Sequence, residues 1–251
     1  MLGKLIKYDF KAMFRSLYPI YVALIALTIV FSLMVKFNFD QGLLFTIFAF
    51  LFVAALNGSI IACVFLVVTR FSHGLLKNEG YLSFALPVST ATHILAKVIN
   101  AIIWAFIEGL MLCVCLLIMG MVMGSIKEVA FFFQEVFQAL GVVEKEVLVV
   151  AAQIIVFLIL EMISSVCLIY AAMAVGHLFS KNQKLIAVAF LIVVCVLRSF
   201  LWVGLVDLTE NAAVYTHTVV DDLILIIPPI VFAAIYAFVT WFILDRKLNL
   251  E

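Results

Sequence analysis

LLFTIFAFLFVAALNGSIIACVFLVV, residues Leu43–Val68, is an apolar run that contains no charged side chain. An α-helix needs about 20 apolar residues to cross a hydrocarbon core of about 30 Å, and this run is long enough. A membrane-spanning strand would instead show about ten residues of alternating apolar and polar character, and this run does not alternate. The run therefore predicts a transmembrane helix.

Five further runs of the same kind lie on either side of it, and they are Tyr18–Val35, Ile94–Met123, Val147–Val175, Leu185–Val206 and Leu223–Leu244. The chain of 251 residues is 68% hydrophobic and 12% charged, whereas soluble domains are about 45–50% apolar and about 25% charged. Six spans and their connections use nearly every residue. We therefore predict an all-α membrane protein with six transmembrane helices and a single transmembrane domain over residues 1–251.

The distribution of basic residues predicts the topology, because cytosolic loops of membrane proteins are enriched in Lys and Arg. With the N-terminus placed in the cytosol, only Lys36, Lys127 and Lys145 fall outside and Arg198 lies within a span, while the rest of the 15 basic residues are cytosolic. We expect both termini in the cytosol. The first run is long and lacks a small-residue cleavage pattern, so it is expected to be a retained span and not a signal peptide.

Two segments outside the spans are amphipathic. In residues 1–17 the side chains follow helical spacing, with Leu2, Ile6, Phe10, Met13 and Leu17 on one side and Lys4, Lys7, Lys11 and Arg15 on the other. This pattern predicts a helix in the cytosolic headgroup layer, near anionic membrane lipids, with Pro19 in the first turn of the next helix. It serves either as a simple anchor or as an elbow that also touches a cytosolic partner. Residues 125–146, with Phe131–Phe133 among acidic and amide side chains, predict an extracellular amphipathic segment that packs at the interface or gates a substrate.

Three charged residues lie inside the predicted spans, and they are Glu108, Glu161 and Arg198. Insertion scales give a cost on the order of 2.5–3.5 kcal/mol for such residues at the helix centre, so a role is expected for each. Arg198 could reach either acid if the helices are neighbours. These residues form a structural ion pair or hydrogen bond, line a polar translocation pathway, or relay protons.

No catalytic, cofactor-binding or metal site is predicted. The GxxxxGK[ST] loop that cradles ATP phosphates, the zinc-peptidase HExxH and the hydrolase GxSxG do not occur in the sequence. The five cysteines lie in predicted spans without metal-site spacing and are expected to pack as small hydrophobes. The net charge of +0 gives no sign of a nucleic-acid partner. Any energy for driven transport must therefore come from another subunit or an ion gradient.

The cytosolic loop between the second and third spans is polar and turn-bearing. Gly74 and Gly80 can break helices, and Ser89 or Thr90 could cap the helix that follows. Residues 75–84 could form a short helix that exposes Glu79.

Three groups of residues carry a resemblance to a known family. The first is Glu79-Gly80-Tyr81-Leu82 and Leu86-Pro87-Val88-Ser89, followed by Ile94-Leu95, Lys97 and Trp104. The others are Ala174-Val175-Gly176-His177-Leu178-Phe179 with Lys181 and Lys184, and Leu5-Ile6-Lys7-Tyr8-Asp9-Phe10-Lys11. The chain resembles the permease subunits of type 2 ATP-binding-cassette (ABC) transporters, of the small six-span bacterial kind. One departure is His177, where this family more often has Gln.

The resemblance implies an export permease in the bacterial cytoplasmic membrane that is not itself an enzyme. Two permeases, identical or different, pair above two cytosolic ATPase subunits, which bind the ATP. The residues expected to couple to the ATPase are Phe71, Leu75, Glu79, Gly80, Tyr81 and Leu82, within a cytosolic coupling segment of residues 70–93. The alternatives are an ion-coupled transporter or channel that uses Glu108, Glu161 and Arg198, and a membrane scaffold or sensor.

Overall fold

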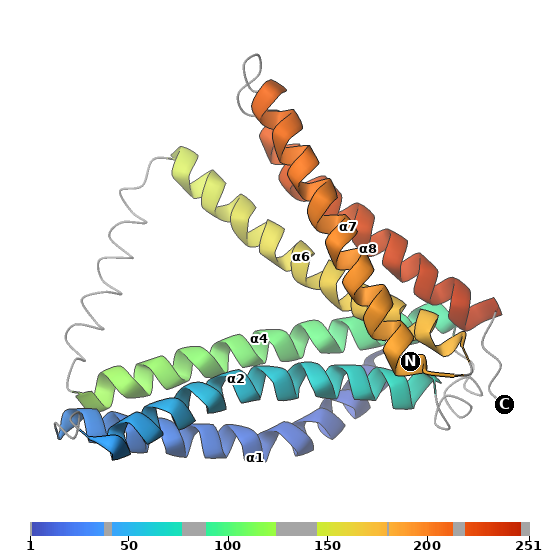
Figure 1. The fold of residues 1–251 in the computed structure, drawn as a ribbon. Helices are drawn as coiled ribbons and strands as arrows, with labels where there is room; N and C mark the ends of the chain where they lie inside the picture. Colours follow the sequence, from blue (N-terminus) through green and yellow to red (C-terminus); the bar gives the residue numbers. More distant parts are fainter. Residues whose placement is uncertain are drawn as a thin grey trace. The chain divides into compact units, whose positions relative to one another are not determined.

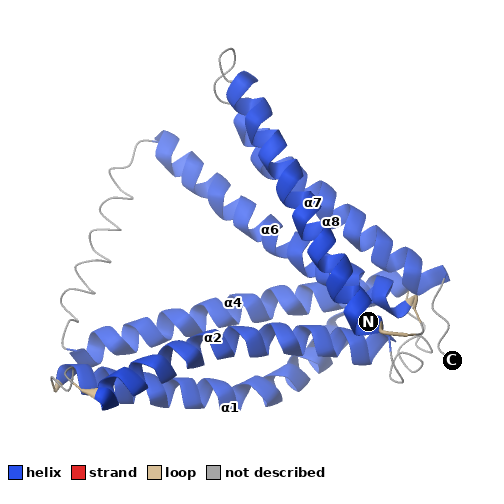
Figure 2. Ribbon diagram, in the orientation of Figure 1, coloured by secondary structure: helices blue, strands red, loops and turns tan. Residues whose placement is uncertain are grey.

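A computed structural model describes residues 2–37, 42–76, 89–123, 145–179, 181–212 and 219–246 of the chain. Nearly all of these residues are helical, and the described ranges contain no strand (Figure 2). Six of the helices are long and apolar enough to cross a membrane. The predicted all-α class is thereby confirmed, with the composition and helix lengths of a multi-pass membrane protein.

Each predicted span lies within one observed helix (Figure 1). The helices are α1 (Leu2–Lys36), α2 (Leu43–Phe71), α4 (Thr90–Met123), α6 (Lys145–His177), α7 (Gln183–Ala212) and α8 (Val219–Arg246). A short π-helical turn, η1 (Ser72–Leu76), extends α2. The predicted extracellular segment of residues 125–146 lies outside the described residues, apart from the first two residues of α6.

The N-terminal segment continues directly into the first span. Residues 1–17 were expected to form a separate interfacial helix, whereas α1 is one helix from Leu2 to Lys36 with Pro19 inside it. Proline lacks a backbone N–H and clashes with the carbonyl four residues earlier, so it commonly bends a helix without ending it. Figure 1 shows α1 bending in its N-terminal half. The interfacial position of residues 1–17 stays a prediction.

The chain forms two compact units. The N-terminal unit contains residues 3–67 and 100–145, and the C-terminal unit contains residues 1–2, 68–99 and 146–251. Two of their boundaries fall well inside α2 and α4, and the other two fall at the first residues of α1 and α6, so the division does not follow a linker in the sequence. The single transmembrane domain of residues 1–251 stays a prediction.

The core of the N-terminal unit is built on the apolar side of α1. Met13 and Leu17 pack with Cys63 of α2 and Trp104 of α4, and all four side chains are buried. Phe10 stacks on Trp104 with ring centroids 5.0 Å apart. Three apolar residues of the amphipathic pattern, Phe10, Met13 and Leu17, therefore face protein. The basic residues of the pattern, Lys4, Lys7, Lys11 and Arg15, are exposed.

The C-terminal unit contains a tight connection between α6 and α7. Asn182 adopts a left-handed backbone conformation, with φ of 61°, which asparagine tolerates better than most residues. A Cβ atom on Gly176 would lie 2.6 Å from the carbonyl oxygen of Gln183 and 2.8 Å from the Cβ of Ala187. Glycine is required at residue 176 because the next helix begins directly against it.

Helix α7 (Gln183–Ala212) presents an apolar surface that the described part of the protein does not bury. Between Gln183 and Gly204 none of its residues is buried, although Leu185, Phe200 and Leu201 are large apolar side chains. In water such a surface would drive aggregation, whereas lipid tails cover it at no cost in hydrophobic free energy.

Replacing Gly176 with valine should destabilise the α6–α7 connection. The new side chain would collide with the backbone of Gln183, and overpacking of this kind costs about 1–3 kcal/mol. The measurement is the SDS concentration that unfolds the purified chain in mixed micelles, followed by circular dichroism. Gly204→Val is the matched control, since nothing lies within 4 Å of its Cβ position. Equal losses in the two variants would contradict the prediction.

Candidate functional site

The Glu108 carboxylate, which is predicted to lie within a span, is held by two hydroxyl groups in the N-terminal unit. Glu108 of α4 is only 6% exposed. Its Oε2 accepts a hydrogen bond of 2.7 Å from Tyr21 Oη of α1, and its Oε1 accepts one of 2.7 Å from Ser59 Oγ of α2. A single carboxyl group therefore joins three helices.

The hydroxyl of Ser59 has two acceptors for its one proton. Its Oγ lies 2.7 Å from Glu108 Oε1 and 2.9 Å from the carbonyl oxygen of Leu56 in its own helix. Ser59 is 1% exposed, so no solvent competes for this proton. Glu108, Tyr21 and Ser59 form a closed hydrogen-bond network, the geometry expected of a structural contact. A role for Glu108 in transport stays a prediction.

Removing either donor to Glu108 should destabilise the N-terminal unit. Tyr21→Phe and Ser59→Ala each leave one carboxyl oxygen without a partner, which costs about 1–3 kcal/mol for a buried polar group. In a Glu108→Leu background the cost of Tyr21→Phe should fall, because the acceptor is already gone. SDS unfolding in mixed micelles measures both effects. Thr28→Val is the control, since the buried Thr28 hydroxyl bonds to the carbonyl of Leu24 in its own helix and joins no second helix through that bond. If Thr28→Val lowered the stability as much as Ser59→Ala does, the result would contradict a stabilising role for the network.

The other acid that is predicted to lie within a span, Glu161, forms an ion pair in the C-terminal unit. The guanidinium of Arg198 in α7 contacts the Glu161 carboxylate of α6. It also lies over the ring of Phe232 in α8, 5.6 Å from the ring centroid, close enough for a cation–π attraction. The pair and the ring together join α6, α7 and α8.

Helix register explains why Arg198 meets Glu161. Glu161 lies 16 residues before His177, the last residue of α6, and Arg198 lies 15 residues after Gln183, the first residue of α7. Two helices joined by a tight turn run back along each other, so these residues reach the same level. The side chain of Arg198 is 16% exposed and that of Glu161 is 34% exposed. Glu108, the other acid that Arg198 could have reached, is hydrogen-bonded within the N-terminal unit.

Neutralising one member of the Glu161–Arg198 pair should cost more than neutralising both. Glu161→Leu or Arg198→Leu leaves a lone charge within a span, at a cost on the order of 2.5–3.5 kcal/mol on insertion scales, whereas the double variant removes both charges. The amount of folded protein in purified membranes and its SDS unfolding midpoint should therefore recover in the double variant. Additive losses in a double-mutant cycle would show that the pair does not act as a unit.

The beginning of the predicted coupling segment is anchored by an aromatic stack. Phe71, at the end of α2, stacks on Tyr170 of α6 with ring centroids 4.0 Å apart and an interplanar angle of 8°. Tyr170 Oη also donates a 3.2 Å hydrogen bond to the backbone carbonyl of Lys97 in α4. We call this arrangement of Phe71, Tyr170 and the Lys97 carbonyl the Tyr170 clamp. It joins α2, before the loop, to α4, after it.

The residues predicted to couple to a partner divide into two groups. Phe71 and Leu75 are both 0% exposed, so their side chains pack inside the protein and offer no surface to another chain. Glu79, Gly80, Tyr81 and Leu82 lie outside the described residues. The expected helix over residues 75–84 can be followed only to Leu76, within η1.

The far end of the loop is fixed to the last helix. Ser89 precedes the first residue of α4, and its carbonyl accepts hydrogen bonds from the amides of Thr92 and His93. Its hydroxyl lies 2.8 Å from the hydroxyl of Thr92, and a side-chain cap by Ser89 or Thr90 stays a prediction. Thr90 Oγ1 donates a 3.1 Å hydrogen bond to Asp245 Oδ1 near the end of α8. The beginning of α4 is therefore held to α6 by the Tyr170 clamp and to α8 by Thr90.

Sequence reasoning missed the partners of the predicted residues. Tyr21 and Ser59 are polar groups in otherwise apolar spans, and that signal alone could have singled them out. Tyr170 and Phe232 look like ordinary aromatic residues of a span. In the described part of the chain no group of three or more His, Cys, Asp or Glu side chains is placed to hold a metal ion.

Comparison with known proteins gives no relative: no family model, no curated protein and no solved structure matches the chain. The function is therefore argued from the sequence patterns and the geometry described above.

Proposed function

We propose that this chain is the permease subunit of an ABC transporter, driven by a separate ATPase that docks on the cytosolic loop between α2 and α4. The proposal has two supports. One is the set of residue patterns around Glu79, Gly176 and the basic N-terminus. The other is the presence of six helices that are long and apolar enough to cross a membrane.

The Tyr170 clamp is the observation that carries the proposal. A loop that only connects two spans needs no rigid attachment at its base. Here both sides of the loop meet one buried side chain, through the Phe71 ring and the Lys97 carbonyl. Protein interiors are close-packed and deform little, so a displacement of residues 77–88 would pass into α2, α4 and α6 together.

The resemblance supplies the rest of the proposed assembly. Two permeases, identical or different, pair in a bacterial cytoplasmic membrane with their termini in the cytosol. ATP binds to the partner ATPases, and this chain has no catalytic role. Glu79 pairs with a basic side chain of the ATPase, and the cycle exports a substrate. A charge-assisted contact at a partly desolvated interface is stronger than an exposed surface pair.

An ion-coupled transporter or channel is the second candidate. Its support is the partly exposed Glu161 carboxylate, which lies at mid-helix beside Arg198. Such a protein would move solute without an ATPase, so transport by the purified chain alone in liposomes separates the two functions.

Reversing the charge of Glu79 should uncouple the transporter. In proteoliposomes that contain the chain and its ATPase, Glu79→Arg should abolish transport-coupled ATP hydrolysis while membrane insertion stays intact, because two cations would then face each other at the docking contact. Glu128→Arg, the same reversal in the predicted extracellular segment, is the control and should leave coupled hydrolysis unchanged. Full coupled turnover in Glu79→Arg would contradict the proposal.

A second pair of variants tests the Tyr170 clamp. Tyr170→Leu removes both the ring stack on Phe71 and the hydrogen bond to the Lys97 carbonyl, so it should retain ATPase binding and lose coupling. Tyr170→Phe removes only the hydrogen bond and should lose part of the coupling. Full coupling in Tyr170→Leu would show that the clamp does not transmit force.

A further inference from the structure

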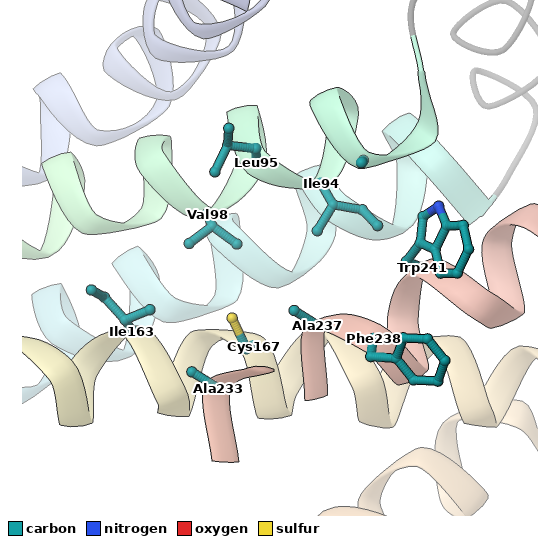
Figure 3. A pocket seen from close by; sticks show the side chains of 10 residues that line it. Ile94, Leu95, Val98, Ile163, Cys167, Ala233, Ala237, Phe238 and Trp241 are labelled. Carbon is teal, nitrogen blue, oxygen red and sulfur yellow. The ribbon is translucent and has the colours of Figure 1, made fainter. Parts of the chain in front are cut away.

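An apolar groove lies in the C-terminal unit, between α4, α6 and α8 (Figure 3). Its volume is about 430 Å³, within the range of about 300–1,000 Å³ that is typical of small-molecule sites. The side chains that define it are the buried Ile94, Val98 and Cys167, the exposed Leu95 and Phe238, and the half-buried Trp241.

The lining chemistry of the groove suits a hydrocarbon chain. No charged side chain lines it, and the indole N–H of Trp241 is its one polar side-chain group apart from the Cys167 thiol. All of its residues belong to helix segments that are apolar enough to cross a membrane. A polar ligand would lose its hydration there without a hydrogen bond in return.

One end of the groove has a different character. Asp245 lies one helical turn beyond Trp241, and Thr90, which donates to Asp245 Oδ1 at 3.1 Å, directly precedes the lining residue Ala91. The exposed carboxylate of Asp245 and the indole of Trp241 therefore lie at the same end of the groove. A carboxylate beside an aromatic face is a common arrangement for binding an ammonium group.

Among the described residues, two cations that neighbour the groove in the sequence have contacts elsewhere. The ammonium of Lys97 lies 3.0 Å from the position that a Cβ on Gly74 would occupy, and the guanidinium of Arg246 lies over the ring of Phe242, 6.0 Å from its centroid. The charged group that a printed contact ties to the groove end is the Asp245 carboxylate, through Thr90. A carboxylate favours a cationic head group over the phosphate of a phospholipid.

We infer that this groove binds a single-chain cationic amphiphile, with its alkyl chain along Ile94, Val98 and Cys167 and its ammonium group at Trp241 and Asp245. Binding of this kind requires no ATPase, so it can be tested independently of the proposed permease function. If the chain is a permease, the groove identifies a substrate or regulator class. Cys167 is three residues before Tyr170, and Val98 follows Lys97, so an occupant would lie next to the Tyr170 clamp.

The test uses the full chain in lipid nanodiscs with Trp241 as the only tryptophan, after Trp104→Phe and Trp202→Phe. Circular dichroism melts establish that this background is folded. The added compounds are dodecyltrimethylammonium and dodecyl maltoside, which share one alkyl chain, and the change in Trp241 fluorescence gives the dissociation constants. The cationic compound should bind about tenfold more tightly, which corresponds to about 1.4 kcal/mol.

Two variants and one control assign the preference to the groove. Asp245→Asn keeps an acceptor for Thr90 and should remove most of the preference for the cation. Ala237→Leu should fill the groove and weaken the binding of both compounds. Asp9→Asn removes the same charge elsewhere on the predicted cytosolic side and should leave the preference intact. Equal affinity for the two compounds in the parent chain would overturn the inference, as would a preference that survives Asp245→Asn. Tighter binding of dodecylphosphocholine than of the ammonium compound would also overturn it and would identify a phospholipid site.

Discussion

Polar groups inside membrane-spanning helices must find their partners within the protein, because hydrocarbon offers none. In the N-terminal unit this constraint brings Tyr21 and Ser59 to Glu108, so that one carboxyl group fixes three helices to each other. In the C-terminal unit it pairs Arg198 with Glu161 and places the guanidinium on the Phe232 ring. Apolar surfaces of these helices are satisfied equally well by lipid, as the unburied stretch of α7 illustrates. Specific helix association in each unit therefore combines close packing of side chains with a few polar contacts that fix which helices meet.

Sequence alone predicts the spans well, because a run of apolar residues such as Leu43–Val68 has few other stable structures. It predicts the entry into the first span less well. Proline was expected to begin a new helix at residue 19, whereas α1 passes through it. A membrane-type helix tolerates this break, since neighbouring groups or local adjustment can satisfy the freed carbonyl. The low helix propensity of Pro19 is therefore outweighed by the helical hydrogen bonds that form before and after it in α1.

Partner choice is harder to predict than the existence of a helix. The sequence shows that Glu108, Glu161 and Arg198 need partners but leaves Arg198 with two acids to choose from. Glu161 and Arg198 lie nearly the same number of residues from the α6–α7 turn, 16 and 15. This near-equality identifies them as partners only once the turn is known to be tight. Stacking of Phe71 on Tyr170 leaves no such trace, because the two residues are far apart in the sequence and each resembles any other aromatic residue near a span end. Contacts of this kind depend on helix order and rotation, which apolar composition does not specify.

Two features of the C-terminal unit use the same stretches of α4 and α6. In the Tyr170 clamp, Tyr170 donates a hydrogen bond to the backbone carbonyl of Lys97. The groove is lined by Val98, which follows Lys97 in α4, and by Cys167, which lies one turn before Tyr170 in α6. A close-packed interior transmits small displacements, so a side chain or ligand that separates α4 from α6 in the groove also strains the clamp. The proposed coupling would use the same contact in the other direction, because a displacement of the loop that shifts Tyr170 would also change the shape of the groove. The proposed permease would need a shared element of this kind to link its loop to the groove, and α6 between Cys167 and Tyr170 is short enough to act as one rigid piece.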